Sequence, residues 1–222
     1  MLKLYQFSAC PFCWKIRVLL DYKRIPYETI EVHPYTKKEL EFTDYKKVPV
    51  LVDEESVITD SSKIMDYLNK KYAISLTDSG DEKWCNWVDD TLVHYFPPII
   101  HKNFKTSFRT IKKITPPGQS SWLKQFFTQT IGAAIMSKVA KKKAIKLGII
   151  DPVAELKLAV EKWVDDGLNG NAFSGGNNPS IADLSVYGVF RSTEQLDIVT
   201  IACNHKPEFA TWYAQCKQLT SS

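Results

Sequence analysis

A Cys-Pro-Phe-Cys sequence at residues 10–13 constrains the fold more than any other feature of the chain. The apolar run before it, residues 2–7, is typical of a strand, and residues 14–21 after it carry apolar side chains at helical spacing. Pro11 suits the first helical position, because its missing N–H would have no partner there. Cys10 is therefore predicted to be the N-cap of a helix, at a strand-to-helix junction.

This position makes Cys10 a candidate nucleophile. Unpaired backbone N–H groups and the positive end of the helix dipole favour a thiolate over a thiol. Cys13 lies one turn further along, where it can attack a mixed disulfide formed at Cys10. The pair is predicted to be a redox or nucleophilic centre.

Two other interpretations of the cysteine pair stay open. It could be half of a zinc site, which needs two more ligands at similar spacing. The remaining cysteines and histidines form no paired motif, so we assign no metal ligand: Cys85, Cys203, Cys216, His33, His94, His101 and His205. The pair could also be two inert buried thiols.

Length and composition are those of a globular protein. The 222 residues suffice for one large domain or two small ones, and 44% are hydrophobic against 24% charged. No apolar run approaches the roughly 20 residues of a membrane span. Met1 leads directly into the first expected strand, so we expect no signal or transit peptide. The odd number of cysteines, five, favours free thiols and a cytoplasmic location.

Charge is distributed unevenly along the chain. Residues 91–150 hold eleven of the 29 basic residues and none of the 25 acidic ones. This basic section, residues 102–146, could attract an anionic membrane surface peripherally, or a carboxylate-bearing substrate. The alternative is a solvated helical face. Because Lys141 to Lys143 lack interleaved aromatic residues, we expect no nucleic-acid binding.

The order of patterns predicts an α/β domain at residues 1–72. The first strand and helix are followed by an alternating strand at 27–32, which predicts a parallel crossover. A brief helix near 37–42 comes next, then a strand at 47–52 and a second at 57–58. These two surround the acidic turn 53–55 and predict a β-hairpin. Asp60 to Ser62 then supply the N-cap of another amphipathic helix.

The rest of the chain is predicted to be helical. A polar linker at 73–81 precedes an all-helical domain at 82–222. Its first helix, 82–94, is expected to end or bend at Pro97-Pro98. A long helix from Trp122 to about Leu147 follows, then one opened by Asp151-Pro152. Ser180 and Asp183 have the spacing of a capping box for the helix 184–190.

With its Cys-x-x-Cys and a Val48-Pro49 at a strand start, the N-terminal order resembles the thioredoxin-like domain of glutaredoxins and glutathione transferases. The layout of both halves resembles a cytosolic glutathione transferase. The resemblance implies that the Val48–Pro49 bond is cis and that Val48 offers its backbone N–H and C=O to the cysteinyl part of glutathione. It places the γ-glutamyl group at Asp60 and Ser61, and adds Phe12 to the binding residues. The alternative is that Asp60 and Ser61 only cap a helix.

Six short motifs resemble, more narrowly, the membrane-associated prostaglandin E synthase type 2 family. They are Leu4-Tyr5-Gln6, Cys10-Pro11-Phe12-Cys13, Tyr45-Lys46-Lys47-Val48-Pro49, Asp60-Ser61-Ser62, Trp87-Val88-Asp89-Asp90 with Leu92-Val93-His94, and Ala182-Asp183-Leu184 with Val186-Tyr187-Gly188-Val189. That family usually carries Tyr where Phe7 stands here, so any role of that hydroxyl is absent.

By this resemblance the protein is a glutathione-dependent thiol enzyme with Cys10 and Cys13 at its catalytic centre. It would either isomerise the endoperoxide of prostaglandin H2 to the hydroxy-ketone of prostaglandin E2, or transfer glutathione. Relatives imply haem as a second cofactor, for which neither His94 nor His101 is assigned as ligand, and a homodimer. The substrate would be a small apolar or fatty-acid-derived molecule, in a pocket for which the candidates are Tyr95, Phe96, Ile99, Phe104 and Phe108.

Two further functions stay open. One is a glutaredoxin-like thiol–disulfide oxidoreductase, which the intact dithiol favours. The other is a non-catalytic glutathione- or haem-binding protein, since a fold and a thiol site can host many functions.

Overall fold

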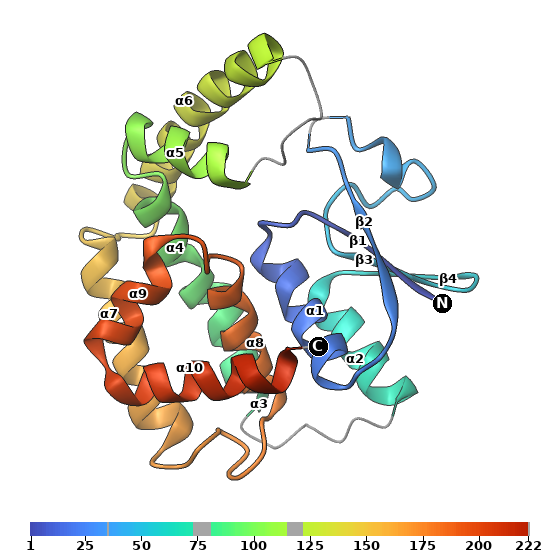
Figure 1. Ribbon diagram of the computed structural model, residues 1–222, viewed down its shortest axis with the longest axis vertical. Helices are drawn as coiled ribbons and strands as arrows, with labels where there is room; N and C mark the ends of the chain where they lie inside the picture. Colours follow the sequence, from blue (N-terminus) through green and yellow to red (C-terminus); the bar gives the residue numbers. More distant parts are fainter. Residues whose placement is uncertain (35, 73–80, 115–121, 222) are drawn as a thin grey trace.

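A computed structural model of the chain describes residues 1–34, 36–72, 81–114 and 122–221, with the backbone alone described at 113, 114 and 122–130. The N-terminal half alternates strands with helices as the sequence predicts (Figure 1). Its elements are β1 (Leu2–Gln6), α1 (Pro11–Tyr22), β2 (Tyr27–Glu31), a short 3-10 helix (Lys38–Leu40), β3 (Val50–Asp53), β4 (Ser56–Thr59) and α2 (Ser61–Lys71).

The four strands form one sheet in the order β2-β1-β3-β4. β1 pairs with β2 in parallel, with Leu4 opposite Thr29, and β3 and β4 form the expected antiparallel hairpin. The crossover and the hairpin are therefore confirmed. β3 begins at Val50 rather than at residue 47, and Pro49 just before it has no N–H to give to a strand ladder.

The C-terminal half is helical in its described residues, and two π-helical segments interrupt its helices. Val88–Leu92 separates α3 from α4, and Trp163–Leu168 follows α7. The helices are α3 (Asp81–Trp87), α4 (Val93–Ile100), α5 (Phe104–Ile114), α6 (Trp122–Lys146), α7 (Pro152–Lys162), α8 (Ile181–Arg191), α9 (Asp197–His205) and α10 (Pro207–Thr220).

The long helix, the Asp151 N-cap and the capping box at Ser180 are confirmed. The helix at the proline pair does not end there, because α4 runs through Pro97 and Pro98 to Ile100. The fixed φ of proline fits a helix, but each proline lacks the N–H that would donate to the preceding turn and its ring crowds the carbonyl there, so the helix continues with a weakened turn. The predicted linker, residues 73–81, lies outside the described residues except for Asp81, which is the first residue of α3.

One hydrophobic core runs through both halves. It includes Leu4 and Ile16 of the first half and a chain of aromatic rings in the second, in which Trp163 contacts Trp84 and Trp212 at centroid distances of 5.2 and 5.4 Å. α1 lies between the sheet and the helical half and packs against α8 (Figure 1). Gly188 permits this contact, because a Cβ there would lie 2.9 Å from the Cα of Lys15.

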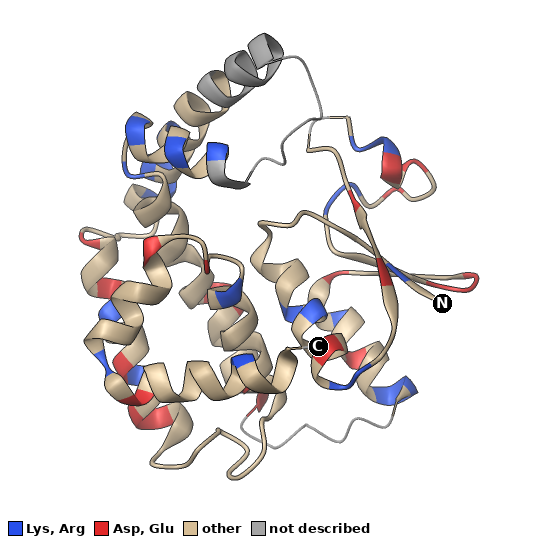
Figure 2. Cartoon of the chain, in the orientation of Figure 1, with Lys and Arg blue, Asp and Glu red and all other residues tan. Residues whose placement is uncertain are grey.

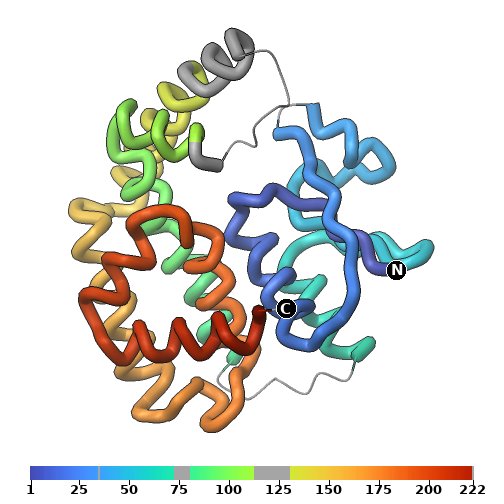
Figure 3. Tube along the Cα trace, viewed as in Figure 1, coloured from blue at the N-terminus to red at the C-terminus, as the bar shows by residue number. Residues whose placement is uncertain are grey.

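The end of the chain returns to the first helix, and the C-terminus lies beside α1 in the trace (Figure 3). Arg24, just after α1, donates a hydrogen bond of 2.9 Å to the Ser221 carbonyl. Among the helices of the described residues, none combines the length and apolar character needed to cross a bilayer.

Candidate functional site

Cys10 is the N-cap of α1, as the sequence predicts. Its backbone is extended (φ −86°, ψ 120°) and Pro11 occupies the start of the helix. The Cys10 N–H donates to the Phe7 carbonyl at 2.9 Å, and the Cys10 carbonyl accepts from the Trp14 N–H at 3.1 Å. The thiol is half-buried and therefore within reach of a small ligand.

The two cysteines differ in their protonation. A hydrogen bond from the Cys13 side chain lowers the pKa of Cys10 most strongly. The sulfur has no hydrogen bond of ordinary capping geometry, but the N–H groups of Cys13 and Phe12 lower its pKa further, against the opposing effect of burial. Burial, together with Cys10 itself, raises the pKa of Cys13. These opposite shifts favour the thiolate form at Cys10 and the protonated form at Cys13.

The loop that carries Cys10 is fixed at Ser8, where both the backbone N–H and the backbone carbonyl are hydrogen-bonded to side chains. The Ser8 N–H donates to a Glu31 carboxylate oxygen at 2.7 Å, and the Ser8 carbonyl accepts from the Trp14 indole N–H at 2.7 Å. Glu31 also accepts from the Gln6 amide at 3.3 Å, and its charge raises the pKa of Cys10. Glu31 was not among the residues predicted from the sequence, because only the β1–β2 pairing brings it beside the loop.

The residues expected to bind glutathione occupy the two connections that precede β3 and α2. The Val48–Pro49 bond is cis, as the resemblance implies. Asp60 is the N-cap of α2 and accepts from the Ser62 N–H at 3.0 Å, while Ser61 is buried at the start of the helix. The Asp60 backbone has a φ of +76°, which is unusual for a residue with a side chain. The N-terminus of α2 attracts a carboxylate.

Tyr45 is a further candidate that the sequence reasoning missed. It packs with Phe7 and Val48 in a small cluster apart from the main core. Burial raises its pKa, and the charges of Asp60 and Cys10 raise it further, so its phenol lies in the electrostatic surroundings of both predicted subsites. Tyr45 is therefore a candidate to supply the hydroxyl that Phe7 lacks.

A buried ion pair joins the cysteine helix to the helical half. Lys15 Nζ lies 2.6 Å from an Asp89 oxygen, and the Lys15 side chain is 1% exposed. The other Asp89 oxygen accepts from the Ser62 hydroxyl at 3.4 Å, next to the Asp60–Ser61 pair. Asp89 belongs to a motif that the sequence analysis quoted, but its partner is 74 residues away and no local pattern indicates it.

The aromatic pocket predicted from the sequence is not assembled as expected. Phe96 is a core residue that packs on Phe190 at 5.1 Å, whereas Phe104 is 48% exposed and stacks on Phe108. The described residues enclose two cavities that we compared with these five candidates. Ile99 alone of the five lines one of them, a small cavity of about 80 Å³ beside Ile198. Phe96 is therefore removed from the substrate candidates.

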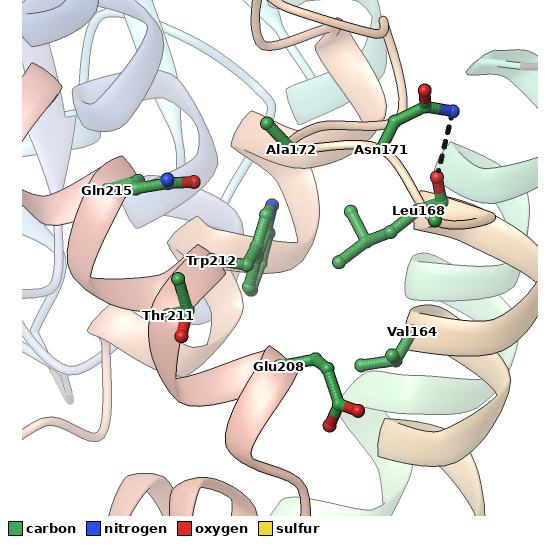
Figure 4. A pocket seen from close by; sticks show the side chains of 9 residues that line it. Val164, Leu168, Asn171, Ala172, Glu208, Thr211, Trp212 and Gln215 are labelled. Atoms are coloured by element: carbon green, nitrogen blue, oxygen red, sulfur yellow. Dashed lines mark hydrogen bonds between the residues drawn. The ribbon is translucent and has the colours of Figure 1, made fainter.

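The larger of these two cavities, about 240 Å³, lies between α10 and the segment around Leu168 (Figure 4). Trp212 and Val164 form part of its wall, and Glu208 lies at the same wall. None of the predicted site residues lines it. Across the described residues, no three His, Cys, Asp or Glu side chains lie together as they would around a metal ion.

Haem does not fit the histidines that we considered. His101 is 5% exposed and its Nδ1 lies 2.8 Å from the Ser107 hydroxyl, while His94 is partly buried beside Lys143, and burial followed by that lysine lowers its pKa. His101 is enclosed and already hydrogen-bonded, and no observation at His94 points to a haem ligand, so we assign no step to haem.

The fold is that of the glutathione transferases, with a thioredoxin-like four-stranded domain followed by a helical one. A glutathione S-transferase from Rhodospirillum rubrum superposes over 98% of this chain and 88% of its own, with a TM-score of 0.65 at 18% identity. Human glutathione transferase theta-2, solved in complex with glutathione and an unknown ligand, matches 100% of this chain and 83% of its own (TM-score 0.60, 16% identity). Residues 4–79 match the glutathione S-transferase N-terminal domain family.

Over nearly its full length, the chain is similar to prostaglandin E synthase 2. The Danio rerio protein of that name is 29% identical over 268 aligned positions, which cover 99% of this chain and 71% of the relative. The resemblance inferred from the six motifs is thereby confirmed.

Proposed function

We propose that the protein is a glutathione-dependent thiol enzyme whose nucleophile is the Cys10 thiolate. The observation that carries this proposal is the pairing of Cys10, at the N-terminus of α1, with a buried Cys13 that can donate a hydrogen bond to it. A thiolate is the reactive form of cysteine, and a helix N-terminus with a nearby donor favours it. The glutathione transferase fold supports the coarser assignment to a glutathione-dependent enzyme.

Glutathione would lie across the segment that precedes β3 and the segment that precedes α2, at one end of the strands. Val48 would pair its backbone with the cysteinyl part, with Pro49 holding the chain direction. Asp60 would bind the ammonium of the γ-glutamyl group, and the start of α2 at Ser61 would attract its carboxylate. Phe12 is half-buried against the core and would border the thiol end of the ligand.

The specific reaction that we propose is isomerisation of an endoperoxide, on the strength of the full-length similarity to prostaglandin E synthase 2. The Cys10 sulfur would bond to one peroxide oxygen while the O–O bond breaks, and the other oxygen would take a proton to become a hydroxyl. Loss of the proton from the carbon that bears the S–O group would then break the S–O bond. This step forms the ketone and returns the thiolate, so the reaction needs no external oxidant or reductant.

A second candidate, thiol–disulfide exchange, is favoured by the position of Cys13. Its thiol is close enough to hydrogen-bond Cys10, so it could attack a mixed disulfide formed there. Cys13→Ser separates the two reactions. An isomerase or transferase should keep its turnover, because Ser still donates a hydrogen bond. Reduction of disulfide substrates should fall, because Cys13 is no longer present to resolve the mixed disulfide at Cys10.

The pH dependence of Cys10 alkylation tests the site directly. We expect the Cys10 peptide, followed by mass spectrometry, to react with an inflection below the free-thiol value of about 8.5 and to be protected by glutathione. The half-buried Cys203 is the internal control, because burial raises its pKa and it lies outside the predicted site. The rate at Cys203 should rise only at higher pH, without protection.

Two outcomes would contradict the proposal. One is a Cys10 inflection at or above that of Cys203, with no protection by glutathione. The other is turnover of prostaglandin H2, or of a transferase substrate, that survives Cys10→Ser. Protection without any turnover would instead favour the non-catalytic glutathione-binding protein.

A further inference from the structure

The described part of α6 has an inverted distribution of side chains. Its buried residues are small, namely Ala133, Ser137, Ala140 and Ala144. Its large apolar residues are exposed: Ile131 is 58% exposed, Ile135 and Val139 are 51%, and Ile145 is 81%. An amphipathic helix of a globular protein normally buries the large apolar residues, so this helix presents to the outside the face that would ordinarily be packed.

Lysines share the exposed face with these apolar residues. Seven exposed positions lie on one side of the helix, because each is three, four or seven residues from others in the set: 131, 135, 138, 139, 142, 145 and 146. Those at 138, 142 and 146 are lysines, and all three are exposed. We call this set, Ile131, Ile135, Lys138, Val139, Lys142, Ile145 and Lys146, the outer face of α6.

The surroundings of the outer face are cationic. No acidic residue occurs between positions 91 and 150. α5 packs against α6 and adds the exposed cations Lys105, Arg109 and Lys112. Figure 2 shows basic residues and no acidic ones along the described parts of α5 and α6, whereas acidic residues occur on α7, α10 and the sheet.

The exposed apolar side chains and lysines together indicate which kind of partner the outer face of α6 can bind. A second copy of the chain bound face to face would bring the same lysines together, since a two-fold interface pairs a surface with itself. An anionic lipid surface satisfies both parts of the pattern. Isoleucine and valine side chains enter the boundary between headgroups and acyl chains, while lysine stems lie along apolar surface and carry their ammonium groups to the phosphates.

We propose that the outer face of α6 binds the surface of an anionic membrane, with the helix lying parallel to the bilayer plane. Residues 131–146 would extend about 24 Å along that surface, at 1.5 Å per residue. The chain then turns at Gly148, which has a φ of +68°, and the following Ile150 is 96% exposed. The proposal is independent of the thiol chemistry, because it involves none of the residues of the cysteine site.

Co-sedimentation of the full chain with vesicles tests this inference. One vesicle preparation is phosphatidylcholine alone, and the other contains about one third phosphatidylserine. We expect binding to the anionic vesicles at low salt, at least tenfold weaker binding to the neutral ones, and loss of binding as salt is raised. Far-UV circular dichroism and the urea unfolding midpoint report whether each variant keeps its helices and its stability.

Three variants identify the face. Ile131→Ser/Ile135→Ser/Val139→Ser should weaken binding at least tenfold with the charge unchanged. Lys138→Glu/Lys142→Glu/Lys146→Glu should abolish it. The matched control, Lys3→Glu/Lys70→Glu/Lys157→Glu, makes the same change in net charge at lysines that are exposed elsewhere, on β1, α2 and α7, and should bind much better than the α6 charge variant.

Three results would overturn the proposal. The unaltered chain could bind neither vesicle, in which case an acidic protein would be the better candidate for this face. It could bind both vesicles equally, which would exclude an anionic surface as the partner. The control and α6 charge variants could lose vesicle binding to the same extent, which would mean that net charge alone, and not the outer face of α6, accounts for the binding.

Discussion

Helices α6 and α8 belong to the same helical half and are buried to opposite degrees. Every residue of α8 from Ile181 to Phe190 is buried, including the polar Asp183 and Ser185. In the described part of α6, small side chains are buried and isoleucines are exposed. Apolar content is therefore not what decides burial in this protein, because both helices carry large apolar residues.

The difference follows from the number of neighbours that each helix has. α8 packs on α1 through Gly188 and on the aromatic cluster through Phe190, which contacts Phe96 and Phe209. It lies between the two halves and is covered on all sides. α6 packs on α4 and α5, at the edge of the helical half, and has no partner on its outer face within the described chain. A helix at the edge of a domain can bury only one face.

The largest effect is expected at the start of α8. Asp183 accepts hydrogen bonds from the Ser180 N–H at 2.8 Å, the Ser174 hydroxyl at 2.7 Å and the Trp212 indole at 2.8 Å. Asp183→Ala would leave these buried donors without an acceptor and should lower the free energy of unfolding by about 3–5 kcal/mol. Urea denaturation measures the loss.

Asp151→Ala is the control for Asp183→Ala. Asp151 caps α7 through the N–H groups of Val153 and Ala154 but is exposed, so its loss should lower the free energy of unfolding by only about 1 kcal/mol. Equal effects of the two substitutions would mean that the burial of α8 adds nothing to its capping box.

The ion pair between the halves should have the next largest effect. Asp89→Asn leaves the buried Lys15 ammonium without its counter-charge and should destabilise the fold by about 3 kcal/mol. Adding Lys15→Met should recover most of the stability, because no unpaired charge is then buried. Both are read from urea unfolding curves.

Asp166→Asn is the matched control for Asp89→Asn. It removes a carboxylate that pairs with Lys162 at 3.5 Å on the surface, and should change stability by at most about 0.5 kcal/mol. If Asp89→Asn has no greater effect than this control, the contact between α1 and the helical half does not depend on the pair.

The smallest effect is expected on the outer face of α6. Ile135→Ala should change the free energy of unfolding by no more than about 0.5 kcal/mol, since the side chain is half exposed and Ala is the better helix former. Ala140→Leu on the buried face should destabilise by about 1–3 kcal/mol through overpacking. A loss of several kcal/mol from Ile135→Ala would place this residue in a packed interface and would remove the contrast with α8.

Local patterns predicted most of the fold. The strand–helix–strand order, the hairpin, the long helix and the capping box at Ser180 all depend on residues close in sequence. α5, α9 and α10 were not predicted, and α4 was expected to end or bend at Pro97-Pro98, yet it runs on to Ile100. In these places, packing against other helices stabilises a helix that its own sequence does not indicate clearly.

The candidate site likewise contains residues that the sequence predicts and residues that only the tertiary structure brings there. Cys10 at a helix start is a local feature, and sequence alone predicts its placement there. The roles of Val48, Asp60 and Ser61 came from resemblance and stay predictions, although the cis bond before Pro49 agrees with them. Glu31 and Asp89 were missed because strand pairing brings the first to the site and contact between the halves brings the second. Tyr45 was missed because only its packing on the small cluster of the N-terminal half brings it there.

The sequence by itself determined the order of the elements in the N-terminal half, the helix start at Cys10 and the absence of acidic residues along positions 91–150. Only the tertiary structure decided that Lys15 is buried against Asp89, that Phe96 belongs to the core, and that the isoleucines of α6 are exposed. The physical reason is that periodicity defines the faces of a helix, whereas burial depends on what packs against each face. For Lys15 that partner lies 74 residues away in the sequence, whereas Ile135 stays half exposed because the described chain does not cover it.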